Sequence, residues 1–189
     1  MREETKKISG RGNLSASKLF IFVLIFFVFA LFNSFFVLTA RAATIYLAPA
    51  TGDYKVGEIF SVGIYVSSPE QAMNAVAGSI LFPAEKLEII SMSKDGSIVN
   101  IWIQEPAFSN SAGTINLEGI VLNPRFIGSA GKVMTVNFKA KSTSRAEINF
   151  SSSYLLANDG QGTNILSGAE NAIFDFGATA GAHRRPGAA

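Results

Sequence analysis

Short segments in which every second residue is apolar restrict the fold of this chain more than any other feature. Between residues 59 and 67, Phe60, Val62, Ile64 and Val66 alternate with small or polar residues. Consecutive side chains of an extended strand point to opposite faces, so such a segment has one apolar and one polar face. After residue 43 the apolar residues do not follow the 3.6-residue period of an amphipathic helix. The pattern therefore predicts an all-β, antiparallel chain.

Nine segments after residue 43 are expected to be strands, with turn residues between them. They are residues 44–48, 59–67, 75–82, 87–92, 98–103, 114–121, 132–140, 146–156 and 172–176. Residues 69–73 are expected to form a brief helical turn. Strands at this spacing, each with one polar face, are typical of two sheets packed face to face. The core of the sandwich is expected to include Phe82, Ile89, Ile115, Val136 and Phe138.

The first 42 residues have the composition of an export signal. Basic residues precede an apolar region at 19–40, and Ala40-Arg41-Ala42 then places small residues at alternate positions. This order is typical of a cleavable signal peptide. The apolar region is also as long as a bilayer-spanning helix, which needs about 20 residues, so an uncleaved membrane anchor is the alternative. Because basic residues stay on the cytoplasmic side, residues 43–176 are predicted to be secreted or on the cell surface, with residues 177–189 as a flexible tail or linker.

The charge of the exported part argues against nucleic-acid binding. The whole chain has a formal charge of +2, but after residue 42 ten Lys and Arg stand against twelve Asp and Glu, which gives −2. Nucleic acids are bound by basic surfaces, and this part of the chain has none in its sequence. We expect membrane contact only through the N-terminal segment, and a monomeric domain.

The residue types needed for most hydrolytic chemistry are missing from the predicted domain. The chain has no cysteine, and its one histidine, His183, is in the tail. Nucleophilic triads, histidine-based zinc sites and histidine general bases are thereby excluded from the sandwich. Paired glutamates such as Glu85 and Glu88 occur at a strand corner, where carboxylates are usually solvated. The domain is predicted to be non-catalytic and to need no cofactor.

Four blocks in the chain resemble the strands of cohesin domains. They are the 74–92 region around the Phe82-Pro83 corner, the Gly57-Glu58 turn into 59–62, the strand at 131–141, and the strand and Asn-Asp-Gly loop at 148–160. The aspartate usual at the family's corner is replaced here by Pro83. The resemblance implies a nine-stranded jelly-roll sandwich, preceded here by the hydrophobic export segment.

The same resemblance implies where a partner would bind. Cohesins bind dockerins through the sheet made by their fifth, sixth, third and eighth strands. Carried over by strand, the outward residues of that sheet are Ala75, Ala77, Ser79, Asn100, Trp102, Asn116 and Glu118.

Alternation in the fifth predicted strand directs the Trp102 indole outward. Val99, Ile101 and Ile103 form a wholly aliphatic face that is expected to point inward, which leaves Trp102 on the opposite side with Asn100. An exposed indole can anchor a protein partner or stack on a sugar. The alternative is that a loop covers the ring, since large aromatic side chains are mostly buried.

A polar loop at 158–164 offers oxygen atoms that calcium accepts. Asn158 and Asp159 lead this loop, but its spacing departs from that of an EF-hand. Asn-Asp-Gly is also a strong turn signal, so a plain turn is the preferred interpretation and calcium the alternative.

The resemblance and the missing catalytic residues together favour an extracellular recognition module. Its partner is expected to be a protein, such as a dockerin or another surface protein, in a polysaccharide-degrading or cell-surface assembly. One alternative is a carbohydrate-binding module of the same fold, with a polysaccharide as its partner. A second alternative is a structural spacer of a surface protein.

Overall fold

The computed structural model describes residues 43–178, which form ten strands and no helix. The strands are β1 Ala43–Ala48, β2 Thr51–Lys55, β3 Ile59–Leu81, β4 Leu87–Ser93, β5 Ile101–Ser109, β6 Thr114–Ile120, β7 Phe126–Ala140, β8 Ala146–Ala157, β9 Leu166–Glu170 and β10 Ala172–Gly177. In this part of the chain no helix is long and apolar enough to cross a membrane. The predicted leader at 1–42 and most of the predicted tail lie outside the described residues, so both stay predictions.

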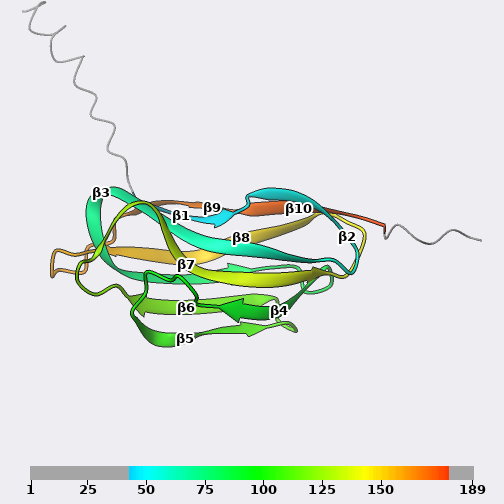
Figure 1. Ribbon diagram of the computed structural model, residues 1–189, viewed down its shortest axis with the longest axis horizontal. Coiled ribbons are helices and arrows are strands. Elements are labelled where there is room, and N and C mark those ends of the chain that lie inside the picture. The colour runs from blue at the N-terminus through cyan, green and yellow to red at the C-terminus, as the bar shows by residue number, and fades with distance from the viewer. Residues whose placement is uncertain (1–42, 179–189) are drawn as a thin grey trace, which may run out of the picture. The chain divides into compact units, whose positions relative to one another are not determined.

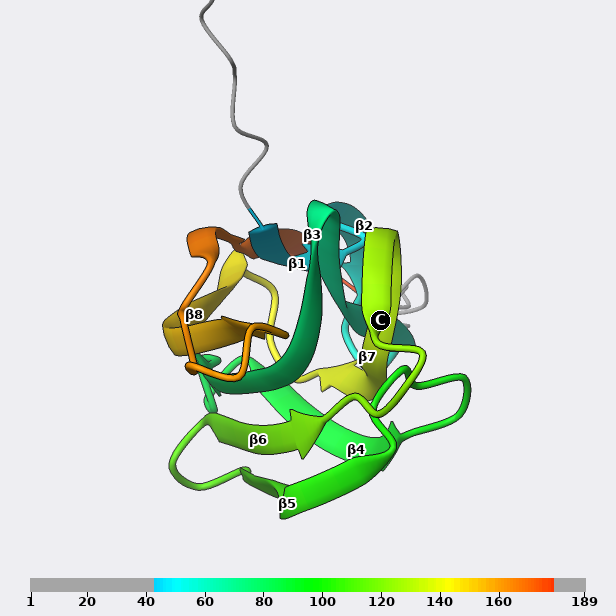
Figure 2. The same ribbon diagram turned by 90° about the vertical axis from the view of Figure 1, so that its left-hand side faces the viewer.

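The strands form the predicted β-sandwich, and β3 belongs to both of its layers (Figures 1 and 2). The first half of β3 pairs with β1 and β7, and its second half pairs with β6 and β8. The first layer has the order β9-β1-β3-β7-β4, and the second has the order β5-β6-β3-β8-β10-β2. All pairs are antiparallel except β1 with β9 and β2 with β10.

Three details of the strand prediction are wrong. The strands expected at 59–67 and 75–82 are one long strand, β3, and residues 69–73 continue it with an irregular register instead of forming a helical turn. The short strands β2 and β9 were not predicted. Most of their residues are exposed or half-buried, so they lack the apolar alternation that marks the other strands.

The predicted core is confirmed. Phe82, Ile89, Ile115, Val136 and Phe138 are all buried, with exposed fractions between 1% and 5%. At one end of the sandwich the ring of Phe60 stacks on Tyr54 and Phe138 and packs at a tilt against Phe174 and Phe176. Because the described chain has no disulfide, this continuous apolar interior holds the layers together.

The face assignment for the fifth strand is wrong. Val99 is buried as predicted, but Ile101 and Ile103 are 45% and 58% exposed. Trp102 pairs with Gly119, which lies on the buried face of β6. The predicted alternation fails because it was counted from Val99, whereas β5 begins only at Ile101 and Val99 is not part of the strand.

Candidate functional site

The outward side chains of β5, β6, β3 and β8 form one continuous surface, which we call the second-layer face. The strand registers place them in rows across the sheet. One row is Ile101, Ile120, Ala75 and Leu156, the next is Gln104, Glu118, Ala77 and Tyr154, and the third is Ala107, Asn116, Ser79 and Ser152. The residues between these rows on β3 and β6 are buried, so the alternation of both strands fixes which side chains face outward.

One half of the second-layer face is an apolar hollow of about 430 Å³. Ala75 and Ala77 form its floor, because their short side chains leave the middle of the sheet low. Ile103 and Tyr154 stand on either side of this floor and are 58% and 52% exposed. Large apolar side chains around a floor of small ones make a surface into which a partner's side chain can insert.

Beyond the hollow, polar side chains lie on the face. Glu118 lies at the edge of the hollow, and within residues 43–178 its carboxylate takes part in no ion pair. In the third row the Ser79 hydroxyl donates to Asn116 Oδ1 at 2.7 Å, which fixes both side chains against the sheet. The face therefore combines an apolar hollow, one carboxylate and a row of small polar groups.

Five of the seven predicted partner-binding residues lie together on this face. They are Ala75, Ala77, Ser79, Asn116 and Glu118. Asn100 precedes β5, and its Oδ1 accepts a hydrogen bond from the backbone N–H of Leu122 at 2.8 Å, so it ties down a loop beside the face.

Trp102 lies on the inner side of β5 and is partly buried against the core. The Lys94 ammonium lies 5.8 Å from the centre of its ring, and Lys94 also forms an ion pair with Glu105 at 2.7 Å. Lys94, in the turn after β4, thus lies over the indole, which is partly buried as in the alternative considered for this residue. The large exposed side chains of this part of β5 are Ile101 and Ile103 instead.

The residues that line the hollow were mostly missed. Tyr154 and Leu156 flank the buried Leu155, so simple alternation in β8 places them outward. Ile120 is likewise outward by alternation in β6, but it was not counted as a site residue. Ile103 was placed on the wrong side because the predicted alternation was counted from the buried Val99, which precedes β5, whereas Ile101, the first residue of the strand, is exposed.

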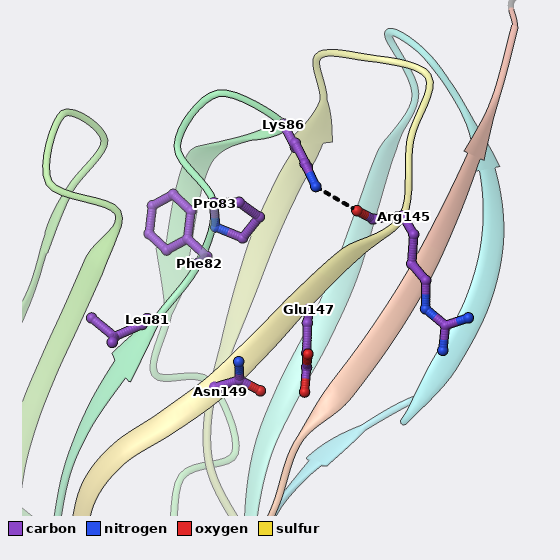
Figure 3. A pocket seen from close by; sticks show the side chains of 7 residues that line it. All are labelled: Leu81, Phe82, Pro83, Lys86, Arg145, Glu147 and Asn149. Carbon is purple, nitrogen blue, oxygen red and sulfur yellow. Dashed lines mark hydrogen bonds between the residues drawn. The ribbon is translucent and has the colours of Figure 1, made fainter.

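A second hollow, also of about 430 Å³, lies beside the Phe82-Pro83 corner (Figure 3). Lys86 Nζ donates to the backbone carbonyl of Arg145 at 2.8 Å across this hollow. Glu147 and Asn149 project into the same region from β8, and the side-chain oxygen of Asn149 is buried without a hydrogen-bond partner. Leu81 pairs with Asn149, so this hollow borders the last row of the second-layer face.

The polar loop that follows β8 forms an Asx turn. Asp159 Oδ1 accepts the backbone N–H of Gln161 at 2.8 Å, and Asn158 Oδ1 accepts Asn74 Nδ2 at 3.3 Å. Hydrogen bonds from Thr163 and from the Gln161 backbone lower the pKa of Asp159. Within residues 43–178 no group of three or more acidic or histidine side chains gathers as a metal site would require.

Comparison with solved structures places the fold. A cohesin from Clostridium thermocellum, crystallised in a type I cohesin–dockerin complex, matches with a TM-score of 0.62 and 12% identity, over 73% of this chain and 95% of that one. The sixth cohesin of scaffoldin B from Acetivibrio cellulolyticus, solved with a dockerin, gives a TM-score of 0.56 and 18% identity over 72% and 99% of the two chains. The seventh type I cohesin of ScaB from Pseudobacteroides cellulosolvens gives 0.56 and 17% over 77% and 99%.

Neither protein-family models nor curated proteins match this sequence. The structural likeness extends over nearly the whole of each of these cohesins, and the resemblance noted in the sequence points to the same fold. Residues 43–178 therefore form a cohesin-like β-sandwich domain.

Proposed function

We propose that this chain is a non-catalytic recognition module whose protein partner docks on the second-layer face. The observation that carries this proposal is the hollow in which Ile103 and Tyr154 flank a floor of alanines. Exposed aliphatic and aromatic side chains around a low centre are the usual anchors of a protein interface. The polar row of Ser79 and Asn116 beside the hollow supplies hydrogen-bonding groups at its rim.

The structural neighbours support a dockerin or another surface protein as the partner. Several of the solved cohesins with this fold are described as complexes with dockerins. The unpaired Glu118 carboxylate beside the hollow favours a partner that brings a lysine or arginine next to an apolar side chain. With the export signal predicted from the sequence, this recognition would take place outside the cytoplasm, at the cell surface or in a secreted assembly.

Binding of the full chain to a panel of dockerin domains, and to proteins secreted by the source organism, tests the proposal. Ile103→Asp should weaken binding by at least about 30-fold, because it places a charge in the centre of an apolar contact. The matched control is Ile59→Asp. Ile59 is 57% exposed, nearly as much as Ile103, but it begins β3 in the first layer. Calorimetric titration of both variants gives the comparison.

Two outcomes would contradict the proposal. If the two variants lose affinity equally, the second-layer face is not the docking site. If the wild-type chain binds none of the dockerins or secreted proteins, the spacer alternative is favoured. If the wild-type chain binds a glycan and Ile103→Asp does not, the carbohydrate-binding alternative is favoured, with its site on this face.

A further inference from the structure

We propose that residues 121–127, which connect β6 to the start of β7, rest on the surface of a lipid bilayer and orient the domain on a membrane. We call this stretch the 121–127 segment. The inference uses the alternative in which residues 1–42 are an uncleaved anchor, with the apolar region at 19–40 in the bilayer. It concerns one end of the sandwich and does not depend on the proposed protein-binding site.

The described part of the chain begins beside this segment. Thr44 of β1 pairs with Ser67 of β3. The next residue of β3, Ser68, pairs with Gly128 of β7. Because β1 and β7 lie on either side of β3, Ala43 and Gly128 are about two strand spacings, roughly 10 Å, apart. The start of β1, the bend of β3 and the start of β7 lie at the same end of the sandwich (Figures 1 and 2).

Two large aliphatic side chains of the segment are exposed. Leu122 is 48% exposed and Ile127 is 59% exposed. Ile127 also lines an open hollow of about 740 Å³, whose other lining residues are Ala72, Asn123, Pro124 and Arg125. This end of the sandwich therefore offers apolar surface close to Ala43, where the described chain begins.

The length of the connection to the apolar region selects lipid as the occupant of this surface. Only residues 41 and 42 separate the end of that region from Ala43. Even when fully extended, the chain from residue 40 to residue 43 spans only about 10 Å. With residues 19–40 in the bilayer, the end of the sandwich that contains Ala43 has to lie next to the headgroups. A protein partner would find little space between this end and the membrane.

The charges at this end suit a lipid surface without net charge. Arg125 is the one charged residue of the 121–127 segment and is exposed, so its guanidinium can reach a lipid phosphate while the aliphatic side chains enter the apolar layer. Two carboxylates lie on neighbouring segments, Glu70 in the bend of β3 and Asp159 in the loop after β8. Since positive charge is not in excess, the contact should form on zwitterionic lipid and should not need anionic lipid.

The segment would set the orientation of the domain, and the anchor would hold the domain at the membrane. Two aliphatic side chains bind a bilayer only weakly by themselves. A tether that keeps them at the surface makes the contact effectively intramolecular, so that weak insertion is enough. The strands would then lead away from the membrane, and the second-layer face would stay open to a partner.

A single fluorescent label on the full chain tests the proposal, because the chain has no cysteine of its own. Ile127→Cys is labelled with NBD, a dye that brightens in apolar surroundings, and the chain is reconstituted in phosphatidylcholine vesicles. The matched control is Ile59→Cys. Ile59 is 57% exposed, but it begins β3 at the opposite end of the sandwich, where it pairs with Lys139. The label at position 127 should be several-fold brighter than the label at position 59, and lipids with a nitroxide on the acyl chain should quench it.

Leu122→Asp, in the chain labelled at position 127, provides a second variant. Leu122 is about half exposed, so the variant should fold, and its circular dichroism spectrum checks this. A charge at this position should keep the segment out of the apolar layer and lower the brightness and the lipid quenching to the level of the label at position 59. Ile59→Asp in the same labelled chain should change neither.

Three results would overturn the proposal. In the first, iodide in the water quenches the labels at positions 127 and 59 equally. In the second, nitroxide lipid quenches both labels equally. In the third, the label at position 127 is shielded from iodide but is not quenched by lipid, which would indicate a protein or a second copy of the chain on this end. A chain that binds its partner while the label at position 127 stays in water would remove this inference alone and leave the second-layer face as the docking site.

Discussion

At the scale of single residues, the position of the Trp102 indole depends on its neighbours. It does not follow from alternation in a regular strand. Its partner Gly119 has no side chain, so the indole can lie against the backbone of β6 and reach the edge of the core. The Lys94 ammonium covers the ring from the other side. A single tryptophan that joins the turn after β4 to the inner side of β5 should contribute to stability.

We expect Trp102→Ala to lower the free energy of unfolding by about 2 kcal/mol, less than for a fully buried aromatic ring. The loss comes from the packing against the core and from the contact with Lys94. Urea unfolding gives the value. It is followed by far-UV circular dichroism, because the variant lacks the tryptophan fluorescence signal. Tyr154→Ala, which truncates a half-exposed ring, should cost no more than about 0.5 kcal/mol. Equal losses in the two variants would mean that Trp102 is not part of the packed edge.

Tyr46 predicts how stability depends on pH at the alkaline end. Burial of the ring, and then the nearby Tyr65 and Glu170, raise the pKa of the Tyr46 hydroxyl. The folded state therefore favours the neutral phenol. Its contribution to stability is complete below the unfolded-state pKa of about 10 and is lost as the pH rises through the higher folded-state pKa.

Tyr46→Phe should accordingly flatten the fall in stability above pH ~10. Phenylalanine keeps the ring, so the difference isolates the ionising group. Urea midpoints measured across the alkaline range for wild type, Tyr46→Phe and the control Tyr154→Phe would show it. A fall that is equally steep in wild type and Tyr46→Phe would contradict the assignment.

At the scale of elements, alternation predicted strands better than it predicted pairing. The period-2 pattern located β1, β4, β6, β8 and β10 to within a few residues, and it assigned the faces of β3 and β6 correctly. It failed in β5, where two register shifts fall within nine residues. A bulge is set by the partner strand and by the turns at either end, neither of which is visible in the alternation of one segment. The hollow's two flanking side chains show both cases. The exposure of Tyr154 follows from alternation around the buried Leu155, whereas that of Ile103 does not follow from alternation counted from Val99, which precedes β5.

Asn110 shows how an element of one layer is tied to an element of the other. It lies in the turn between β5 and β6, and its side chain pairs with β4 as another strand would. Its Oδ1 accepts the backbone N–H of Ile89 at 2.8 Å, and its Nδ2 donates to the Ile89 carbonyl at 3.0 Å. These bonds satisfy the backbone of β4 next to its register shift between Ile89 and Ser91.

Asn110→Ala should destabilise the domain by about 1–3 kcal/mol, because it leaves a part-buried N–H and C=O of Ile89 unpaired. Ser111→Ala, one residue further along the same turn, removes only an exposed hydroxyl contact and should change stability by no more than about 0.5 kcal/mol. Hydrogen exchange of the Ile89 amide, which should quicken only in Asn110→Ala, checks the mechanism. Unchanged exchange would mean that β4 does not rely on this side chain.

At the scale of the whole molecule, the class and architecture were predictable while the strand count was not. A sandwich needs only that each strand bury one face. The alternating positions of buried residues such as Val62 and Phe138 predict this directly. The joining of 59–67 and 75–82 into β3 depends on how the chain bends between the two layers, which no local pattern encodes. The second-layer face was identified in part for the same reason. The alanines of its floor lie on a regular part of β3, whereas the exposed Ile103 lies on the irregular strand β5.

The polar loop at 158–164 allows a prediction for the whole domain in the presence of calcium. Asp159 and Asn158 already use their oxygens in hydrogen bonds to Gln161 and Asn74, so a bound ion would have to replace these contacts. We therefore expect the thermal midpoint of the full chain to be the same with calcium and with a chelator. A true site occupied at a hundredfold excess over its dissociation constant would stabilise the folded state by about 2.7 kcal/mol, a shift of several degrees. A rise of that size with calcium, abolished by Asp159→Asn and retained in Asp53→Asn, would establish the calcium alternative, because Asp53 is an exposed carboxylate on a different element, β2.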